Sequence, residues 1–255
     1  MVRQTIEAGN DRLLVEDSGG DGPPVVLLHS GIADMRMWDR VVPALSVTHR
    51  VIRYDLRGYG GSTPPSEPYD WVSDLEQVLD RCGLESAHLV GSSVGGATAL
   101  ALALASPDRV RSLVLMAPGI SGYPWPEEPQ LAERWAALAQ VGDREGLIDL
   151  MIEVWCSAGE DATVRELVTQ ATGAQGGEGT WWRELDPTWD RLGELTIGTL
   201  LMVGDLEPPA MVEATVAAAS RIPAARLIRV PDADHLLQVR VPDLVVAAIQ
   251  GHCRD

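Results

Sequence analysis

The chain has 255 residues, 45% of them hydrophobic and 22% charged, which suits one large folded domain with an insertion rather than a disordered chain. Its 37 acidic and 20 basic side chains give a formal charge of -17, which repels phosphate backbones and anionic lipids and argues against nucleic acid and membranes as partners. The N-terminal stretch MVRQTIEAGNDRLLVED lacks the apolar core of a secretion signal, and no apolar run is long enough to span a bilayer, so we expect a cytoplasmic protein.

Short apolar runs rich in Val, Leu and Ile alternate with helix-like segments. QTIEAG and RLLVEDSG are expected to pair as antiparallel strands around a turn at Gly9 and Asn10. Further strands are expected at 24–29, 49–55, 87–92, 109–118, 199–205 and 225–232. One helix is expected to start near Asp70, and a second, at 94–105, is so apolar that it must be buried. The pattern predicts an α/β fold with a mostly parallel sheet flanked by helices.

The strand rhythm stops after Pro118 and resumes near Thr199. Helix-like pieces fill this interval at 129–140, 143–156 and 161–171, and the glycine-rich GAQGGEG (173–179) is a candidate mobile joint. We interpret 120–196 as a helical cap inserted into a core domain formed by 1–119 and 197–255.

Six of the eight tryptophans belong to this predicted cap: Trp125, Trp135, Trp155, Trp181, Trp182 and Trp189. Most are expected to pack the cap onto the core, because exposed indole rings are unfavourable. One or two are expected to line a substrate pocket.

The stretch HLVGSSVGGAT (88–98) contains a G-x-S-x-G pattern centred on Ser93. At a sharp turn between strand and helix, the Ser93 hydroxyl would project above the start of the helix, where amide groups and the helix dipole favour negative charge. The same glycines also let a helix pack tightly on a sheet, so this short pattern by itself fits both a nucleophile and a purely structural turn.

Four other segments follow predicted strands: LLHSGIADMRMWD (27–39), YDLRGYGGS (54–62), VGDLEPP (203–209) and PDADHLLQVRVPD (231–243). With the serine turn, they resemble the α/β-hydrolase fold superfamily over nearly the whole chain apart from the cap. YDLRGYGGS is similar to the family's D-x-R-G-x-G-x-S loop, whereas Ser30 stands where the family usually has glycine. Among its members, the chain looks most like enol-lactone hydrolases and small bacterial esterases. The resemblance implies a serine hydrolase.

The resemblance implies Ser93 as the nucleophile and His235 as the base that takes its proton, since a hydroxyl is a weak nucleophile near neutral pH. His29 and His88 are alternatives by residue type. His29 begins the loop after a predicted strand and is expected to be structural, while His88 stands early in its strand. His49 and His252 are interpreted as surface residues.

The catalytic acid has two candidates. In the family it stands three residues after the glycine that ends its strand, which from Gly204 gives Glu207, and the resemblance therefore favours Glu207 as the triad acid. Asp205 is the rival, with a turn or helix cap as its other role. Asp232 and Asp234 are expected to shape the histidine loop.

The resemblance also assigns an oxyanion hole to the backbone amides of Gly31 and Val94. Other residues of these loops are expected to be structural. Asp34 is interpreted as a helix cap and Trp38 as a packing residue. Asp55, Arg57 and Ser62 are expected to hold the 54–62 loop by hydrogen bonds and charge pairing.

The leading hypothesis is a serine hydrolase that cleaves a carboxylic ester or lactone, a small-molecule substrate, through an acyl-enzyme. Other triad chemistry is the alternative: a carbon-carbon bond hydrolase, a proline iminopeptidase-like enzyme, a cofactor-free haloperoxidase, or a biosynthetic acyltransferase or cyclase. A receptor-like ligand-binding protein is a further alternative from a different class. Serine at 93, rather than aspartate, argues against epoxide hydrolases and haloalkane dehalogenases.

We expect no cofactor and no metal. GDGPP lacks the lysine of a phosphate-binding loop, and the histidines lack ligand spacing. The three cysteines, Cys82, Cys156 and Cys253, are too widely separated for a disulfide framework or a metal knuckle and are expected to be buried thiols.

Overall fold

The computed structural model describes residues 1–174, 181–223 and 225–254. Residues 175–179 of the predicted GAQGGEG joint lie outside this part of the chain. Within it, the strands are β1 (Val2–Ala8), β2 (Asp11–Asp17), β3 (Pro24–Leu28), β4 (Arg50–Tyr54), β5 (Ala87–Ser92), β6 (Val110–Met116), β7 (Gly198–Gly204) and β8 (Arg226–Val230). The α-helices are α1 (Val42–Leu45), α2 (Trp71–Arg81), α3 (Val94–Ala105), α4 (Pro129–Val141), α5 (Arg144–Trp155), α6 (Ala162–Ala174), α8 (Pro209–Arg221), α9 (Leu237–Arg240) and α10 (Pro242–His252), and the 3-10 helices are η1 (Met35–Trp38), η2 (Pro107–Arg109) and η4 (Trp189–Glu194).

The strands form one sheet in the order β1-β2-β4-β3-β5-β6-β7-β8. β1 and β2 form an antiparallel pair around Gly9, which has a φ of 64°, and β2 also runs antiparallel to β4. All other neighbours are parallel. The predicted α/β class with a mostly parallel sheet is therefore confirmed.

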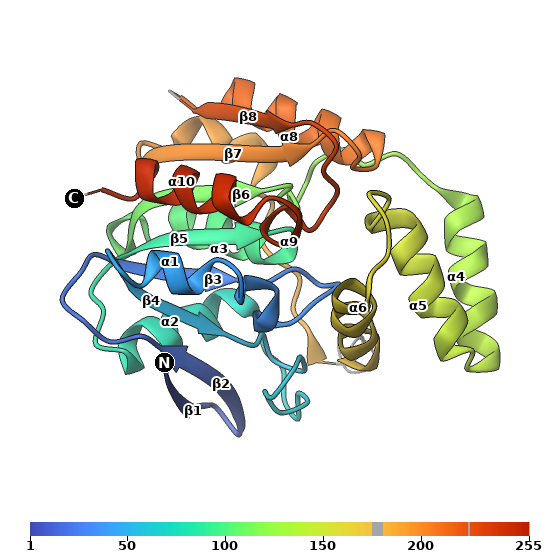
Figure 1. The fold of residues 1–255 in the computed structure, drawn as a ribbon, viewed down its shortest axis with the longest axis horizontal. Coiled ribbons are helices and arrows are strands. Elements are labelled where there is room, and N and C mark those ends of the chain that lie inside the picture. The colour runs from blue at the N-terminus through green and yellow to red at the C-terminus, as the bar shows by residue number, and fades with distance from the viewer. Residues whose placement is uncertain (175–180, 224, 255) are drawn as a thin grey trace.

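Helices cover both faces of the sheet. Because successive strand residues point to opposite faces, Leu28 and Leu89 pack in one apolar cluster, with α2 and α3, while Leu27 and Val90 pack in the other, with α1 and α10. Figure 1 shows α1 and α10 in front of the sheet and α2, α3 and α8 behind it. The strands are nearly continuous apolar runs because both of their faces are buried.

Helix α3 packs unusually closely on the sheet. Its residues from Thr98 to Leu104 are all buried, as expected from their apolar character. A Cβ atom added to Gly95 would lie 2.6 Å from the carbonyl oxygens of both Leu28 and His29, and one added to Gly91 would lie 2.4 Å from the carbonyl oxygen of Gly95. Only glycine permits this approach, so Gly91 and Gly95 set where α3 begins.

We expect Gly95→Ala to destabilise the protein by about 3 kcal/mol, because the added methyl group meets backbone atoms that cannot rotate away. Urea unfolding followed by circular dichroism measures the loss. Gly251→Ala is the matched control: Gly251 lies in α10 with no heavy atom within 4 Å of an added Cβ, so its unfolding midpoint should stay the same or rise slightly. Equal stability of Gly95→Ala and wild type would refute the close approach.

The helices expected within the insertion are present as α4, α5 and α6. They lie beyond the carboxyl ends of the parallel strands (Figure 1). Buried side chains of α5 and α6, Ile148, Met151 and Leu167, belong to the same apolar cluster as Met116 and Met202 at the ends of β6 and β7. This apolar contact seats the two helices on the sheet. No helix in the described part of the chain has the length and apolar character needed to cross a membrane.

Candidate active site

Ser93 lies at the turn between β5 and α3 in a conformation that L residues rarely adopt, with φ 53° and ψ -116°. Three backbone hydrogen bonds hold the turn: its amide donates to the Met116 carbonyl (2.9 Å), and its own carbonyl accepts from Ala97 (2.9 Å) and Gly119 (3.0 Å). A strained turn of this kind lifts the side chain above the carboxyl edge of the sheet. The side chain of the preceding residue, Ser92, is buried.

His235 and Glu207 meet in a buried contact. His235 follows β8, Glu207 follows β7, and the imidazole Nδ1 lies 2.9 Å and 3.0 Å from the two carboxylate oxygens. Both side chains are at most 1% exposed. Because an ionised carboxylate only accepts, Nδ1 carries the hydrogen and Nε2 is left unprotonated in the neutral ring. This is the tautomer that a general base needs.

The other acidic residues of these loops have different partners. Asp205 is 38% exposed and forms an ion pair with Arg229 (2.6 Å). Asp232 is exposed at a turn with φ 56°. Asp234 is buried and forms an ion pair with Arg240 (2.7 Å). Of the two acid candidates, Glu207 is the one in contact with His235.

Gly31 and Val94 lie side by side. A methyl group placed on Gly31 would be 3.7 Å from Cγ1 of Val94. Val94 is the first residue of α3, so its amide belongs to the helix N-terminus, where amide groups lack partners within the helix. The loop of Gly31 is anchored by the buried Ser30, whose amide donates to the Met37 sulfur (3.3 Å).

The remaining histidines have structural contacts. His29 is buried; Nδ1 lies 2.8 Å from the Ser30 carbonyl and therefore donates, while Nε2 accepts from the Leu56 amide (2.8 Å). His88 bonds Ser112 Oγ (2.8 Å) inside the sheet. The expectation that His49 is a surface residue is wrong: its ring is buried, with Nε2 2.8 Å from the Cys253 carbonyl. His252 is half-buried beside the Gly198 carbonyl.

Burial lowers the pKa of His29 below its ordinary value of 6.5, although the nearby Asp55 and Asp34 oppose the shift. The unfolded chain takes up this proton near pH 6.5, whereas the folded protein does so only at lower pH. We therefore expect His29 to reduce the free energy of unfolding as the pH falls below about 6.5. Urea unfolding of wild type and His29→Gln at several pH values tests this, since the variant should lose that part of the slope. Identical slopes would contradict it.

The loop at 54–62 is tied down as expected. Asp55 accepts from the amides of Met35 (2.8 Å) and Gly61 (2.7 Å), and Ser62 Oγ donates to the Asp55 carbonyl (2.6 Å). Arg57 forms buried ion pairs with Asp11 (2.6 Å) and Asp74 (2.5 Å). Asp34 caps η1 by accepting from the Arg36 amide, and Trp38 is fully buried. These residues shape the loops around the site.

Two of the hollows in the described part of the chain differ in their distance from this site. A cavity of about 460 Å³ between α4, α5 and the loop after β7 is lined by Leu131, Trp135, Val154, Trp155 and Pro208, among others. Its wall includes Trp155, whose ring centroid is 4.7 Å from that of His235. The sequence pattern does not predict this contact, because Trp155 and His235 belong to distant parts of the chain.

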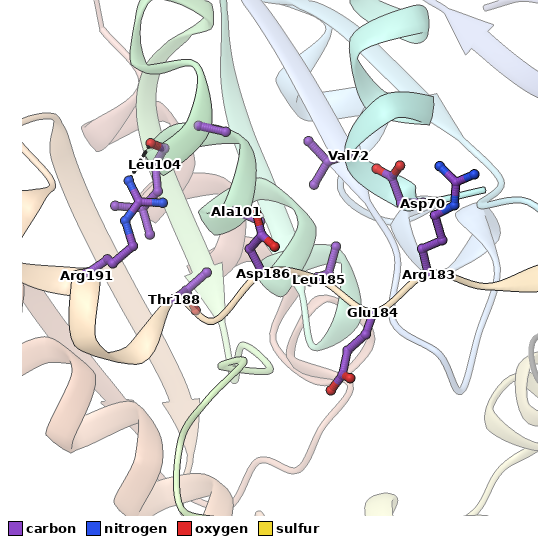
Figure 2. Close-up of a pocket in the computed structure, with 11 residues that line it drawn as sticks. Asp70, Val72, Ala101, Leu104, Arg183, Glu184, Leu185, Asp186, Thr188 and Arg191 are labelled. Atoms are coloured by element: carbon purple, nitrogen blue, oxygen red, sulfur yellow. Dashed lines mark hydrogen bonds between the residues drawn. The ribbon is translucent and has the colours of Figure 1, made fainter. Parts of the chain in front are cut away.

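Figure 2 shows a second hollow, a groove of about 250 Å³ between α3 and the segment 183–191. Ala101 and Leu104 line it from the later turns of α3, about 15 Å along the helix from Ser93 at 1.5 Å per residue. Arg191 donates to the Leu104 carbonyl at its rim (3.0 Å). This groove is therefore separate from the candidate site.

Within the described ranges, no group of three His, Cys, Asp or Glu side chains is arranged to hold a metal ion. That the protein uses no metal and no cofactor stays a prediction. Cys82, Cys156 and Cys253 are all buried and unpaired by disulfides, as expected. Burial raises the pKa of Cys156 to about 12 and that of Cys253 to about 11, so both are protonated thiols near neutral pH.

The sheet order, the strained serine turn and the loops at the carboxyl ends of the strands define an α/β hydrolase. A family model described as "alpha/beta hydrolase fold" matches residues 23–169, more than half of the chain. The chain therefore belongs to the α/β-hydrolase fold family.

Several hydrolases are similar to this chain. A 2-hydroxymuconate semialdehyde hydrolase from Pseudomonas sp. (strain CF600) is 37% identical over 155 residues, which cover 58% of this chain and 53% of that protein. A rhodomycin D methylesterase from Streptomyces sp. (strain C5) is 27% identical and is matched over 91% of both chains. The enol-lactonase structure from Burkholderia xenovorans LB400 has a TM-score of 0.81 at 25% identity, with 98% of this chain and 99% of that chain covered. The chain thus spans only about half the length of the first relative, so the substrate is a matter for proposal.

Proposed function

We propose that the protein is a serine hydrolase that cleaves a carboxylic ester or lactone through an acyl-enzyme, with Ser93, His235 and Glu207 as its triad. The observation that carries this proposal is the buried contact of 2.9 Å between His235 Nδ1 and the Glu207 carboxylate. It leaves Nε2 as the basic atom and compensates the positive charge that the ring gains on taking a proton.

In the first half of the proposed cycle, Ser93 Oγ attacks the ester carbonyl carbon while its proton passes to His235 Nε2. The carbonyl π electrons move to the oxygen, and the amides of Gly31 and Val94 donate to this oxyanion. When the oxyanion collapses, the bond to the alcohol oxygen breaks, and that oxygen takes the proton from His235 Nε2. The alcohol leaves, or stays attached in the case of a lactone, and the acyl group remains on Ser93.

In the second half, water attacks the acyl carbon and gives a proton to His235 Nε2. The new oxyanion collapses and expels Ser93 Oγ, which recovers that proton. The products are a carboxylic acid and free enzyme, so no redox partner or cofactor takes part.

The substrate class is supported by two observations. The hollow lined by Trp135, Val154 and Trp155 is mainly apolar, and Trp155 of its wall contacts His235, which suits an apolar or cyclic acyl group. The similarity of the chain to a methylesterase and to an enol-lactonase, over nearly the whole lengths of those proteins, favours esters and lactones as substrates.

A second candidate reaction is hydrolysis of a carbon-carbon bond. It is favoured by the similarity to 2-hydroxymuconate semialdehyde hydrolase and to a 2-hydroxy-6-oxo-2,4-heptadienoate hydrolase from Pseudomonas putida, which is 43% identical over 128 residues. The same triad residues would serve this reaction.

The test combines labelling and turnover. Wild-type protein is treated with a fluorophosphonate, and peptide mass spectrometry locates the adduct; we expect one adduct, on Ser93. In parallel, short p-nitrophenyl esters, lactones and 2-hydroxy-6-oxo-2,4-heptadienoate are compared by kcat/KM. Multiple turnovers of esters or lactones support the proposal, and a preference for the dienoate supports the second candidate. Folded protein with neither adduct nor turnover would overturn both and favour a receptor-like role. The cytoplasmic location stays a prediction.

A further inference from the structure

The last residue of α5 and the segment after it make several contacts with the loops that carry His235 and Glu207. We define residues 155–159, which begin with the last residue of α5, as the α5 tail. The His235 amide donates to the Trp155 carbonyl (3.2 Å), and the Trp155 ring is tilted by 47° against the imidazole with 4.7 Å between centroids. Ser157 Oγ donates to the carbonyl of Leu206 (2.7 Å), next to Glu207. The α5 tail thus touches both loops of the proposed triad.

Asp234 connects the α5 tail to the histidine loop. Its side chain is fully buried and accepts from the Ala158 amide (3.0 Å), the Leu236 amide (3.1 Å) and the Arg240 guanidinium (2.7 Å). Arg240 in turn donates to the Gly159 carbonyl (2.5 Å). A buried carboxylate is costly unless it is paired and hydrogen-bonded, and these donors meet that need. The pair therefore fixes the α5 tail to the backbone on both sides of His235.

These contacts restrain the backbone position of His235, the hydrogen bond of its Nδ1 and the orientation of its ring. Glu207 fixes Nδ1, the Trp155 carbonyl fixes the backbone position, and the tilted indole packs beside the imidazole ring. A base must reach its proton within about 0.5 Å of the productive geometry, and a displacement of about 1 Å can cost about 100-fold in rate. His235 lies in a loop, so such restraint has to come from outside that loop.

We propose that the α5 tail, held by the Asp234–Arg240 pair, is a positioning element for His235, with Trp155 and Asp234 as positioning residues. This inference rests on the proposed function. It means that the position of α5 on the sheet determines whether the His235 imidazole is aligned for proton transfer.

The test compares Asp234→Asn and Trp155→Leu with wild type. We expect each to lower kcat for the best ester by about 10- to 100-fold, because proton transfer is disturbed. Asp234→Asn should also leave KM within about threefold, since Asp234 does not line the apolar hollow, whereas Trp155 lines it, so Trp155→Leu is expected to change KM as well. Fluorophosphonate labelling of Ser93 should slow in proportion. Glu153→Gln is the matched control: Glu153 lies on the same helix and loses only an exposed ion pair with Arg134, so its kcat should equal that of wild type.

A readout besides activity keeps the inference separate from the proposed function. The hydrogen on His235 Nδ1 should give a downfield proton resonance in wild type, assigned by its loss in His235→Gln. We expect it to shift or broaden in Asp234→Asn and Trp155→Leu but not in Glu153→Gln. Trp155→Phe, which keeps an aromatic ring, should recover part of kcat and of the resonance.

Unchanged kcat and an unchanged resonance in either variant that folds would overturn the inference. A rise in KM with constant kcat in Asp234→Asn would also overturn it, because that result would assign the α5 tail to substrate binding. If wild type itself is neither labelled nor active, the proposed function fails, and the resonance still decides whether the α5 tail positions the ring.

Discussion

Ser93→Ala is expected to lower kcat by about 10⁴- to 10⁶-fold, the loss found when the nucleophile of a serine triad is removed. Without Oγ no acyl-enzyme forms, and residual turnover comes only from binding and the oxyanion amides. The backbone bonds of Ser93 do not involve its side chain, so the fold should be kept. Steady-state kinetics on the best ester, with circular dichroism as a check of folding, measures the effect. A decrease of less than about tenfold would exclude Ser93 as the nucleophile.

Ser92→Ala is the matched control. Ser92 Oγ is buried and has no hydrogen-bond partner among the described residues, so its removal leaves no group unsatisfied. We expect kcat within about threefold of wild type and equal or slightly higher stability, because an unpaired buried hydroxyl is unfavourable. If Ser92→Ala were the more damaging change, the assignment of the nucleophile to the centre of the motif would be wrong.

Glu207→Gln is expected to lower kcat by about 10²- to 10⁴-fold. The amide loses the negative charge that compensates the protonated imidazole and can donate to Nδ1, which favours the wrong tautomer. The side chains are similar in size, so substrate binding and KM should change little. Kinetics on the same ester measures both constants.

Asp205→Asn is the control for the acid, because it lies two residues away on the same loop. It loses an exposed ion pair with Arg229, which contributes at most about 1 kcal/mol to stability, and we expect kcat within about twofold of wild type. A larger loss in Asp205→Asn than in Glu207→Gln would transfer the acid role to Asp205.

The sequence predicted much of the sheet because its strands are buried on both faces and appear as short apolar runs between helices. Residue type and order alone do not separate Asp205 from Glu207, since both follow β7, and only the family resemblance favours Glu207. The two carboxylates have different partners because β7 pairs with β8. Gly204 pairs with Val230, and the neighbouring Arg229 donates to the Asp205 carboxylate.

The prediction that His49 is a surface residue is wrong for a related reason. It follows Thr48 in a short polar stretch, which suggests a surface turn, but the C-terminal end of α10 covers it and the Cys253 carbonyl accepts from its ring. The contact of Trp155 with His235 is equally remote in sequence. Local patterns do not contain such information, because it depends on how distant segments pack.

The buried state of the thiols has a practical consequence. Cys82, Cys156 and Cys253 lie inside the protein, and burial keeps the pKa of Cys156 near 12. Reagents that attack thiolates should therefore leave the native chain unmodified while it is folded. A cysteine introduced at Val141, which is 76% exposed at the end of α4, could then carry a single fluorophore. The movements of this helical region can thus be followed in solution without replacing any native cysteine.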